Sequence, residues 1–381
     1  MDSPLGAELS LDQLSTDPYG HLARLRVVEP VSWVPVLDGW LITRRDLCTQ
    51  VMRDAATFTV DDPRFSTAQV VGPSMLSLDG DEHRRHRDPF ASGLVQGQVR
   101  DRFTDRVNEE AQHVVAALAP VGRAEIRREL AGPLAVAVVA AALDLVDVEV
   151  SELLGWYDTI VADVDRLSSG GEASGEGQQA VAQMGVHVLH SSEHRAGLLA
   201  AARLGMADGE VLSNAAVMMF GGIETSEGMT TSLFWHLLKN PEQLQMVRGD
   251  RSLARQAIEE SLRLEPAAAR VDRYATRDID LEGASIQEGD LVIVSLTAAN
   301  RDPAVFIDPD RFDVLRTNAR SHLAFAIGPH ACIGIHLAKL ETLAALNAVL
   351  DLWPLVRLDG EPESPTGLVF RKPRTVNVQW G

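Results

Sequence analysis

Cysteine is scarce in this chain, with only two residues, Cys48 and Cys332, among 381. Two cysteines that lie far apart with different neighbours exclude the disulfide framework of a small secreted domain. Cys48 follows Arg45-Asp46-Leu47 in a helix-like run, and we expect a small buried side chain there. Cys332 lies in a glycine-rich loop, so the two residues have different expected roles.

Positive charge and long hydrophobic runs are also limited. Lys and Arg number 35 against 54 Asp and Glu, a formal net charge of −19, which argues against a nucleic-acid-binding protein. The longest apolar run, Leu134 to Leu143, is far shorter than the roughly 20 residues of a membrane helix and suits a buried helix. Because Met1-Asp2-Ser3-Pro4 has no signal-peptide pattern, we expect a cytoplasmic protein that binds no membrane.

Apolar residues make up 45% of the chain, enough for a large core, and their spacing predicts a mainly α fold with small β-sheets (α+β). Without an internal repeat or a clear linker, we expect one domain over 1–381. Its β-rich portions are expected at about 25–60 and 270–300, and its helical bulk at about 81–265 and 335–352. In the first β-rich portion, an Asp38-Gly39 turn separates two short strands, and Thr43 is expected to cap the next helix.

One glycine- and serine-rich stretch, residues 168–177, interrupts the helical part. Its composition is typical of a surface linker, and it also suits the hinge of a lid over a binding cleft.

The strongest motif is Phe325-Ala326-Ile327-Gly328-Pro329-His330-Ala331-Cys332-Ile333-Gly334. A cysteine that binds a metal must lose its proton, and backbone N–H groups aimed at the sulfur favour this. The glycines permit a tight loop, and the helix expected after Cys332 directs its positive end at the sulfur. Because no second cysteine lies nearby for zinc or an iron–sulfur cluster, an axial thiolate on haem iron is favoured over a buried cysteine in a turn.

This segment resembles the cysteine-ligand loop of the cytochrome P-450 family, F-G-x-G-x-[HR]-x-C-x-G, with Ala326 in place of the first glycine. The resemblance implies haem b with Cys332 as the iron ligand, and Phe325, His330 and Gly334 close to the cofactor. It also implies the family's fold, a triangular prism in which haem lies between a long oxygen-activating helix and the cysteine loop.

A second motif, Phe220-Gly221-Gly222-Ile223-Glu224-Thr225, lies within a predicted helix from Val211 to Leu238. Two glycines cost a helix about 1 kcal/mol each relative to alanine, which indicates close helix packing or a groove that admits oxygen and water. An acid followed by an alcohol could carry protons to bound oxygen. The pair matches the family motif [AG]-G-x-[DE]-T, which implies catalytic roles for Glu224 and Thr225.

Two further motifs gain meaning only from the resemblance. Glu260 and Arg263 are three residues apart on one predicted helix face, and the family pattern pairs them with an arginine of a following P-x-R-F segment, here Arg311. His83 and Arg87 lie four apart in a local basic patch, where a solvated helix face is the plainer interpretation. The family's H-x-x-x-R pattern implies that they bind the haem propionates, together with Arg273 and His330.

The pocket residues are also inferred from motif positions. Val217, Phe220 and Gly221 are expected to face the distal pocket, Ala269 to Val271 to line it, and Pro63 to Met75 to cover it. Arg270 is a candidate polar contact, although a surface salt bridge is the preferred interpretation. In this context the stretch 168–177 is interpreted as the mobile loop of a lid.

The resemblance implies a monooxygenase that uses O2 and two electrons to hydroxylate a small, largely apolar molecule, such as a specialised-metabolite intermediate. Because the sequence shows no flavin or ferredoxin module, the electrons are expected from a separate ferredoxin, with a reductase that uses NAD(P)H. The ferredoxin is expected to dock on the cysteine side, near Lys339. The alternatives are a peroxide-using peroxygenase of the same fold, a desaturating or coupling variant, and a non-catalytic haem-based binder or sensor.

Overall fold

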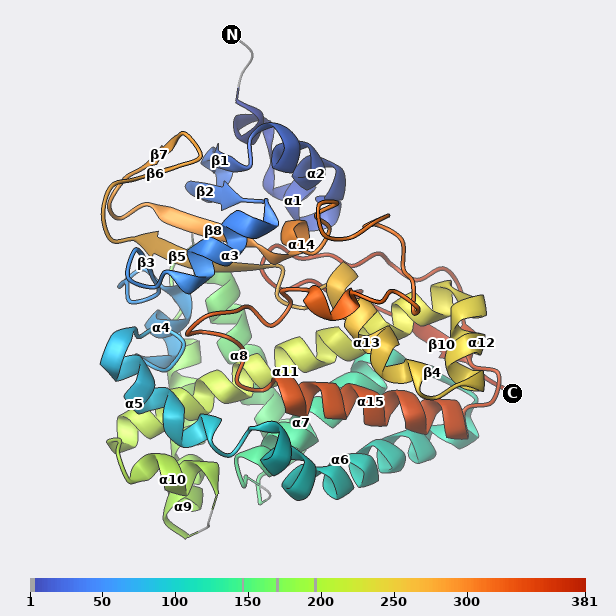
Figure 1. Ribbon diagram of the computed structural model, residues 1–381. Coiled ribbons are helices and arrows are strands. Elements are labelled where there is room, and N and C mark those ends of the chain that lie inside the picture. Colours follow the sequence, from blue (N-terminus) through green and yellow to red (C-terminus); the bar gives the residue numbers. More distant parts are fainter. Residues whose placement is uncertain (1–3, 146, 169–170, 195–196) are drawn as a thin grey trace.

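The computed structural model describes residues 4–145, 147–168, 171–194 and 197–381 (Figure 1). The signal-peptide prediction for Met1, Asp2 and Ser3, and part of the lid prediction for 168–177, therefore lie outside the described residues. The rest of that stretch connects helix α8 (Val150–Ser168) to helix α9 (Glu176–His194).

Helices form most of the molecule, as the sequence predicts. The longest, α11 (Asp208–Lys239), has buried residues on all its sides, because other helices surround it through most of its length. The other α-helices are α1 (Leu11–Thr16), α2 (Tyr19–Val28), α3 (Arg45–Arg53), α4 (Ser66–Val71), α5 (Gly80–Ala91), α6 (Gln96–Leu118), α7 (Gly132–Ala142), α10 (Leu198–Arg203), α12 (Pro241–Gly249), α13 (Leu253–Leu264), α14 (Leu296–Ala299) and α15 (Ile335–Leu352). A π-helix, η4 (Ile126–Ala131), precedes α7.

The strands form three small sheets that bring together distant parts of the chain. The largest has the order β1-β2-β8-β5-β3, in which β2 and β8 are parallel and the other pairs are antiparallel. The second has the order β4-β10-β9, and the third is the hairpin β6-β7. Their bounds are β1 (Val31–Val34), β2 (Gly39–Ile42), β3 (Phe58–Thr59), β4 (Arg123–Glu125), β5 (Arg270–Ala275), β6 (Ile279–Leu281), β7 (Ala284–Ile286), β8 (Leu291–Ser295), β9 (Arg357–Leu358) and β10 (Asn377–Gln379).

The helix after β2 begins differently from the prediction. Helix α3 begins at Arg45, and its backbone N–H binds the carboxylate of Asp302 at 3.0 Å. Thr43 does not cap it, because its hydroxyl donates to the Pro30 carbonyl instead. Cys48 in this helix is fully buried, as expected.

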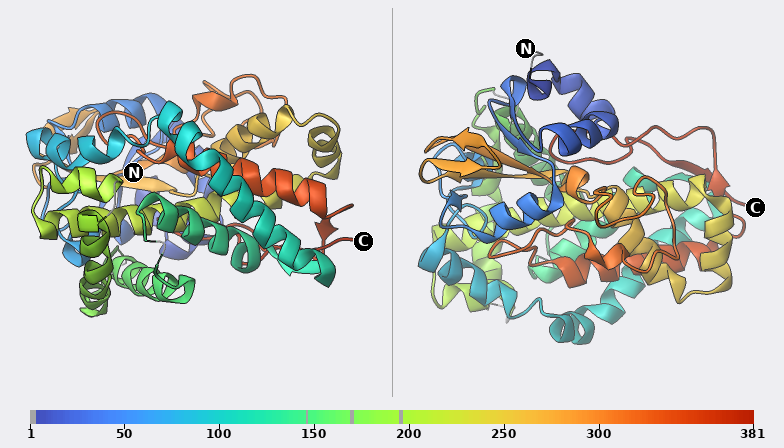
Figure 2. Two further views of the ribbon diagram at one scale, coloured as in Figure 1. Left: turned by 90° about the horizontal axis from the view of Figure 1, so that it is seen from below. Right: turned by 45° about the horizontal axis from the view of Figure 1, so that its top comes forward.

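The fold determines where the segment that carries Cys332 lies. Figures 1 and 2 show the five-stranded sheet with α1, α2 and α3 at one end of the molecule and the helical bulk at the other. Helix α15 packs between α6 and α11, and the segment that carries Cys332 leads directly into α15. Among the described residues, no helix combines the length and the apolar character that a bilayer span requires.

Candidate active site

A cavity of about 710 Å³ lies between α11 and the segment before α15, with Thr225 and Cys332 in its wall. Val217, Phe220, Gly221 and Val271 line it, where the sequence placed them. The covering segment contributes Arg64 to Thr67 and Met75.

Two pocket predictions need correction. Ala269 was expected in the wall, but its N–H binds the Val369 carbonyl and its carbonyl accepts from Thr297, which hold it between two segments and out of the cavity lining. Arg270 lies within the range that was expected to line the cavity and forms a salt bridge, with Asp272, but the expected surface location is wrong, because Arg270 is only 8% exposed.

The loop before Cys332 depends on two residues in left-handed conformations. Ala326 has φ 52°, at the position where the family pattern has glycine, and Gly328 has φ 80°. Gly328 also lies so close to α3 that an added Cβ would sit 2.4 Å from the Met52 carbonyl oxygen. The turn survives the alanine, since the Cys332 N–H donates to the Phe325 carbonyl at 2.8 Å.

Opposing effects act on the Cys332 sulfur. Burial raises the pKa of this thiol, while the N–H groups of Gly334 and Ile335 and the guanidinium of Arg87 lower it. Those N–H groups belong to the first turn of α15, whose positive end adds to the same effect. The sulfur is therefore placed to bind a cation that stabilises the thiolate.

Four cationic or hydrogen-bonding side chains gather beside this loop. The rings of His83 on α5 and His330 lie 4.3 Å apart, and His330 also binds Asp79 at 2.8 Å. Burial, followed by His330 and Arg87, lowers the pKa of His83 to about 4. The Nε2 atom of His83 and the Nδ1 atom of His330 are buried without a hydrogen-bond partner among the described residues.

Arg87 and Arg273, like the two histidines, have incomplete hydrogen bonding among the described residues. Within the described residues their side chains donate only to backbone carbonyls, those of Ala331 and Asp272, and make no ion pair with a carboxylate. Arg273 is only 4% exposed. Two such arginines and two histidines with free ring nitrogens suit the two propionates of haem, and the single cysteine of the adjoining loop suits its iron. The residues present therefore fit haem.

Thr225 and Glu224 point to different surroundings on α11. The Thr225 hydroxyl donates to the Gly221 carbonyl at 2.5 Å and lies in the cavity wall. Glu224 is 6% exposed, forms an ion pair of 2.8 Å with Lys372, and accepts a hydrogen bond from Tyr157. Burial, followed by Glu224, raises the pKa of Tyr157, so its hydroxyl keeps its proton.

Gly221 and Gly222, which precede the Glu224–Thr225 pair, have different surroundings. A Cβ on Gly222 would lie 2.7 Å from Val139 on α7, which shows close helix packing. A Cβ on Gly221 would meet nothing within 4 Å, because this position faces the cavity. The groove that was considered for this position would have to form without a break in the helix, since α11 is continuous through both glycines.

Sequence reasoning missed the partners of Glu224. Lys372, near the end of the chain, also binds Glu227 at 3.0 Å, and Arg127 of η4 binds Glu227 from the other side. The two carboxylates and the two cations balance in charge beside the cavity. No local motif contains these residues, because Tyr157, Arg127 and Lys372 come from three separate segments.

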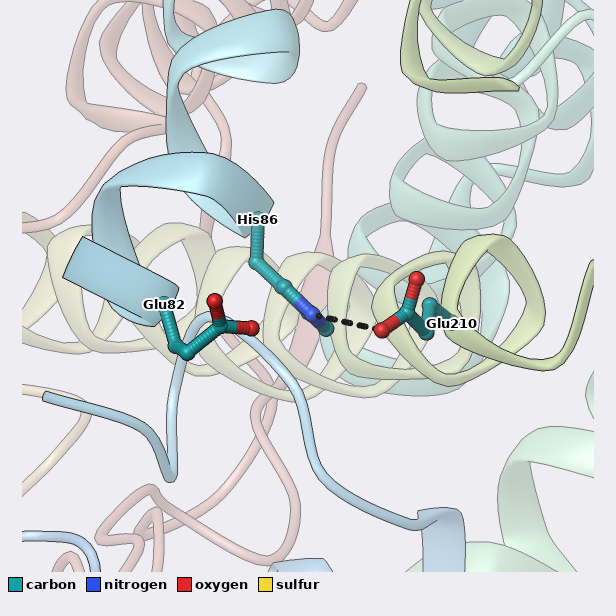
Figure 3. A group of neighbouring side chains, drawn as sticks. All are labelled: Glu82, His86 and Glu210. Carbon is teal, nitrogen blue, oxygen red and sulfur yellow. Dashed lines mark ion pairs between the residues drawn. The ribbon is translucent and has the colours of Figure 1, made fainter. Parts of the chain in front are cut away.

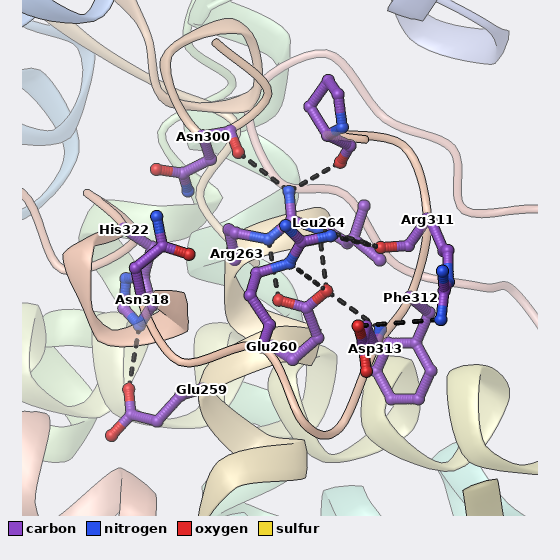
Figure 4. Close-up of polar contacts among 12 residues, drawn as sticks. Glu259, Glu260, Arg263, Leu264, Asn300, Arg311, Phe312, Asp313, Asn318 and His322 are labelled. Carbon is purple, nitrogen blue, oxygen red and sulfur yellow. Dashed lines mark hydrogen bonds and ion pairs between the residues drawn. The ribbon is translucent and has the colours of Figure 1, made fainter. Parts of the chain in front are cut away.

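The hydrogen-bond network around Glu260 differs from the prediction at one residue (Figure 4). Arg263 binds both oxygens of the fully buried Glu260 at 2.7 and 2.8 Å. The predicted third member, Arg311, is wrong: its side chain is 67% exposed and pairs with Asp313. Arg316 takes the place, binding Glu260 at 2.9 Å with its side chain 8% exposed.

The path of the backbone explains why the prediction for Arg311 is wrong. The Arg311 carbonyl accepts from Arg263, so this residue contributes its main chain and its side chain points to solvent. The chain then turns, and Arg316 donates back to the carbonyls of Ile307, Asp308 and Arg311.

Lys339, expected to help dock a ferredoxin, has an internal partner. Its ammonium binds both oxygens of Glu259 at 2.8 and 2.9 Å and lies over the Phe325 ring. Although burial opposes it, His322 and Lys339 hold the pKa of Glu259 at about 2. The charge of Lys339 is thus balanced within the protein.

A buried acid on α15 also escaped sequence reasoning. Glu341 is 1% exposed, lines the cavity and approaches Ser226, and its Oε1 has no partner among the described residues. Burial raises its pKa to about 8, so near neutral pH it holds a proton.

Replacing Glu341 by glutamine is expected to stabilise the protein at alkaline pH. Between the ordinary carboxyl pKa and about 8, Glu341 is ionised in the unfolded chain and protonated in the folded one, so stability falls as pH rises. Glu341→Gln removes this loss, and from the shift of the pKa from 4.5 to about 8 we expect about 4 to 5 kcal/mol more stability at pH 8.5 than the wild type, and little difference at pH 4.5. Urea unfolding at both pH values measures it, with exposed Glu242→Gln as control. Equal pH dependence in wild type and Glu341→Gln would contradict this.

A group of possible metal ligands, Glu82, His86 and Glu210, lies between α5 and the start of α11 (Figure 3). The guanidinium of Arg85 binds both carboxylates, at 2.7 Å to Glu82 and 2.6 Å to Glu210. The positive charge that balances these two carboxylates is therefore the guanidinium of Arg85.

A cysteine and a threonine in the wall of one largely apolar cavity, together with arginines and a histidine in the same wall, define a haem-thiolate enzyme. The family model for cytochrome P450 matches residues 195–377, and the sequence is 32% identical over 371 residues to the cytochrome P450 monooxygenase PikC of Streptomyces venezuelae, covering 91% of this chain and 86% of that protein. The chain belongs to the cytochrome P450 family and is a haem-dependent monooxygenase.

Two further relatives support the assignment. The 20-oxo-5-O-mycaminosyltylactone 23-monooxygenase of Streptomyces fradiae is 30% identical over 375 residues, which cover 89% of this chain and 83% of that one. The crystal structure of P450BioI, in complex with an acyl carrier protein ligated with hexadec-9Z-enoic acid, has a TM-score of 0.87 and 26% identity, and covers 96% of this chain and 99% of that one. Bacterial members of this family take electrons from redox partners.

Proposed function

We propose that this monooxygenase hydroxylates a small, largely apolar intermediate of specialised metabolism, with electrons from a separate ferredoxin and its NAD(P)H-dependent reductase. The observation that carries the proposal is the cavity, in which apolar walls surround Thr225 on one side and Cys332 on the other. The similarity to PikC and to the 20-oxo-5-O-mycaminosyltylactone 23-monooxygenase supports the choice of substrate class.

In this proposal, haem bound by Cys332 supplies the chemistry that activates oxygen. Arg87, Arg273, His83 and His330 hold its propionates and fix its orientation. The apolar walls orient the substrate and exclude water from it. Phe325 and Gly334 allow the cofactor to approach the cysteine loop closely.

The protein's own contribution to the reaction is the supply of protons. The Thr225 hydroxyl holds a proton at the cavity wall, and the neighbouring Glu224, held in place by Tyr157 and Lys372, supplies the carboxyl group that exchanges protons with it. This acid–alcohol pair favours a monooxygenase over the peroxygenase alternative, which brings its protons with hydrogen peroxide.

Replacing Thr225 by alanine is expected to separate NAD(P)H consumption from product formation. With the proton donor lost at the cavity wall, we expect at least a fivefold lower ratio of product to NAD(P)H, with the excess appearing as hydrogen peroxide. The ratio is measured in a reconstituted ferredoxin and reductase assay with a substrate found by spectral screening.

Thr231→Ala is the matched control. Thr231 lies on the same helix and also donates to the carbonyl four residues earlier, at 2.7 Å, but it is fully buried and away from the cavity. A Thr225→Ala ratio equal to that of Thr231→Ala would remove Thr225 from the reaction. Equal turnover with hydrogen peroxide alone would favour the peroxygenase.

A further inference from the structure

Arg270 is the first residue of β5, three positions before Arg273. Side chains alternate along a strand, so Arg270 and Asp272 share one face, while Val271 and Arg273 share the other. The cavity borders both faces, and Arg270 points to a different part of it from Arg273, the arginine that suits a haem propionate. The charge of Arg270 therefore needs another explanation.

The Arg270 guanidinium is buried and poorly paired. Its side chain is 8% exposed, and Nε and Nη1 have no hydrogen-bond partner among the described residues. Its nearest acid, Asp272, lies 3.3 Å from Nε and 3.4 Å from Nη2, and the Asp272 Oδ1 atom also has no hydrogen-bond partner.

A structural arginine elsewhere in the protein shows the contrast. Arg371 is 1% exposed, and its three nitrogens donate to the Glu265 carboxylate at 2.9 Å, to the Tyr19 hydroxyl and to three backbone carbonyls. Burying a guanidinium without such partners is costly, because the lost hydration is not replaced. Arg270 therefore has unused capacity to bind an acceptor.

The apolar part of the cavity lining indicates what that acceptor is attached to. Leu11, Val36, Leu37, Leu291 and Leu368 line the same cavity and suit an apolar body. The planar guanidinium binds carboxylates through two parallel hydrogen bonds. Because Asp272 already balances part of the charge, a singly charged anion fits better than a doubly charged one.

We propose that Arg270 binds a carboxylate of the substrate, at the end remote from the carbon that is oxidised. This inference rests on the proposed function, because it assigns the substrate class for the same cavity: an apolar molecule with one carboxylate. The carboxylate occupies the free donors of Arg270 and displaces Asp272 from its long contacts.

The test compares dodecanoic acid with dodecan-1-ol, which share an apolar chain and differ in the head group. Binding to the ferric protein is followed at pH 7.5 by the shift of the Soret band. We expect the wild type to bind the acid at least tenfold more tightly than the alcohol. In Arg270→Gln, affinity for the acid is expected to fall at least tenfold, with that for the alcohol unchanged within twofold.

Two further variants make the result specific. Arg64 also lines the cavity, but its side chain is 57% exposed and paired with Asp62 at 2.8 Å, so Arg64→Gln is expected to keep the preference for the acid. Asp272→Asn removes the competing anion and is expected to tighten acid binding severalfold. This second variant tests the proposal even if Arg270→Gln does not fold.

Equal affinities for acid and alcohol in the wild type would overturn the proposal, as would a parallel loss of both in Arg270→Gln. Either result leaves the monooxygenase intact, because the thiolate spectrum and the Thr225→Ala coupling assay do not depend on Arg270. Failure of those two measurements would instead remove the proposed function itself.

Discussion

Replacing Cys332 by alanine is expected to abolish the red-shifted Soret band that the reduced, carbon-monoxide-treated protein gives when a thiolate binds haem iron. The sulfur lies at the first turn of α15 and in the cavity wall, where the iron of a haem held by Arg87 and Arg273 would meet it. Absorption spectra of purified protein from haem-replete cells measure the effect, which we expect to be complete.

Cys48→Ala provides the control for this experiment. Cys48 is the other cysteine of the chain, and burial raises its thiol pKa within α3, so it remains a thiol. We expect Cys48→Ala to lose some stability and to keep the full band. A thiolate band that persists in Cys332→Ala, or disappears in Cys48→Ala alone, would show that the iron ligand has been assigned to the wrong cysteine.

Replacing Arg316 by alanine is expected to destabilise the protein by about 3 kcal/mol. Glu260 is fully buried and accepts hydrogen bonds from Arg263, from Arg316 and from the Asp313 N–H. Without Arg316, this carboxylate keeps only part of its compensation. The carbonyls of Ile307, Asp308 and Arg311 also lose a donor. Urea unfolding followed by far-ultraviolet circular dichroism measures the loss.

Arg311→Ala tests the residue that the family pattern first indicated. Its side chain is 67% exposed, and the main-chain carbonyl that it supplies is retained in alanine. We therefore expect a change below about 0.5 kcal/mol. If Arg311→Ala were as destabilising as Arg316→Ala, the assignment of Arg316 to this network would be wrong.

These two arginines show how far sequence patterns reach. Spacing along one helix was sufficient to pair Glu260 with Arg263, because three residues place two side chains on one face. The third partner lies in an irregular segment, where no periodicity indicates which way a side chain points. There the backbone path decides, and it turns Arg311 outwards and Arg316 inwards.

The residues of the cavity show the same limit of sequence patterns. The helix expected at about 335–352 is α15, periodicity located α11, and the motifs placed Thr225 and Cys332 in the wall of one cavity. Ala269 was misplaced, and Arg270 was assigned to the surface, at the point where β5 begins beside a bridge between Ala268 and Phe370, a contact between segments far apart in sequence. Tyr157, Lys372 and Glu341 escaped for a related reason, since their importance arises from tertiary neighbours.

The position of Lys372 has a consequence for how the enzyme matures. This residue, which neutralises Glu224 and Glu227, belongs to a segment more than 130 positions further along the chain than either acid. Until that segment docks, α11 carries two buried acids with one cation, Arg127, which pairs with Glu227. These acids therefore have their full compensation only when the last part of the chain is in place, and an enzyme clipped shortly before residue 370 is expected to keep its helices while Glu224 loses its ammonium partner.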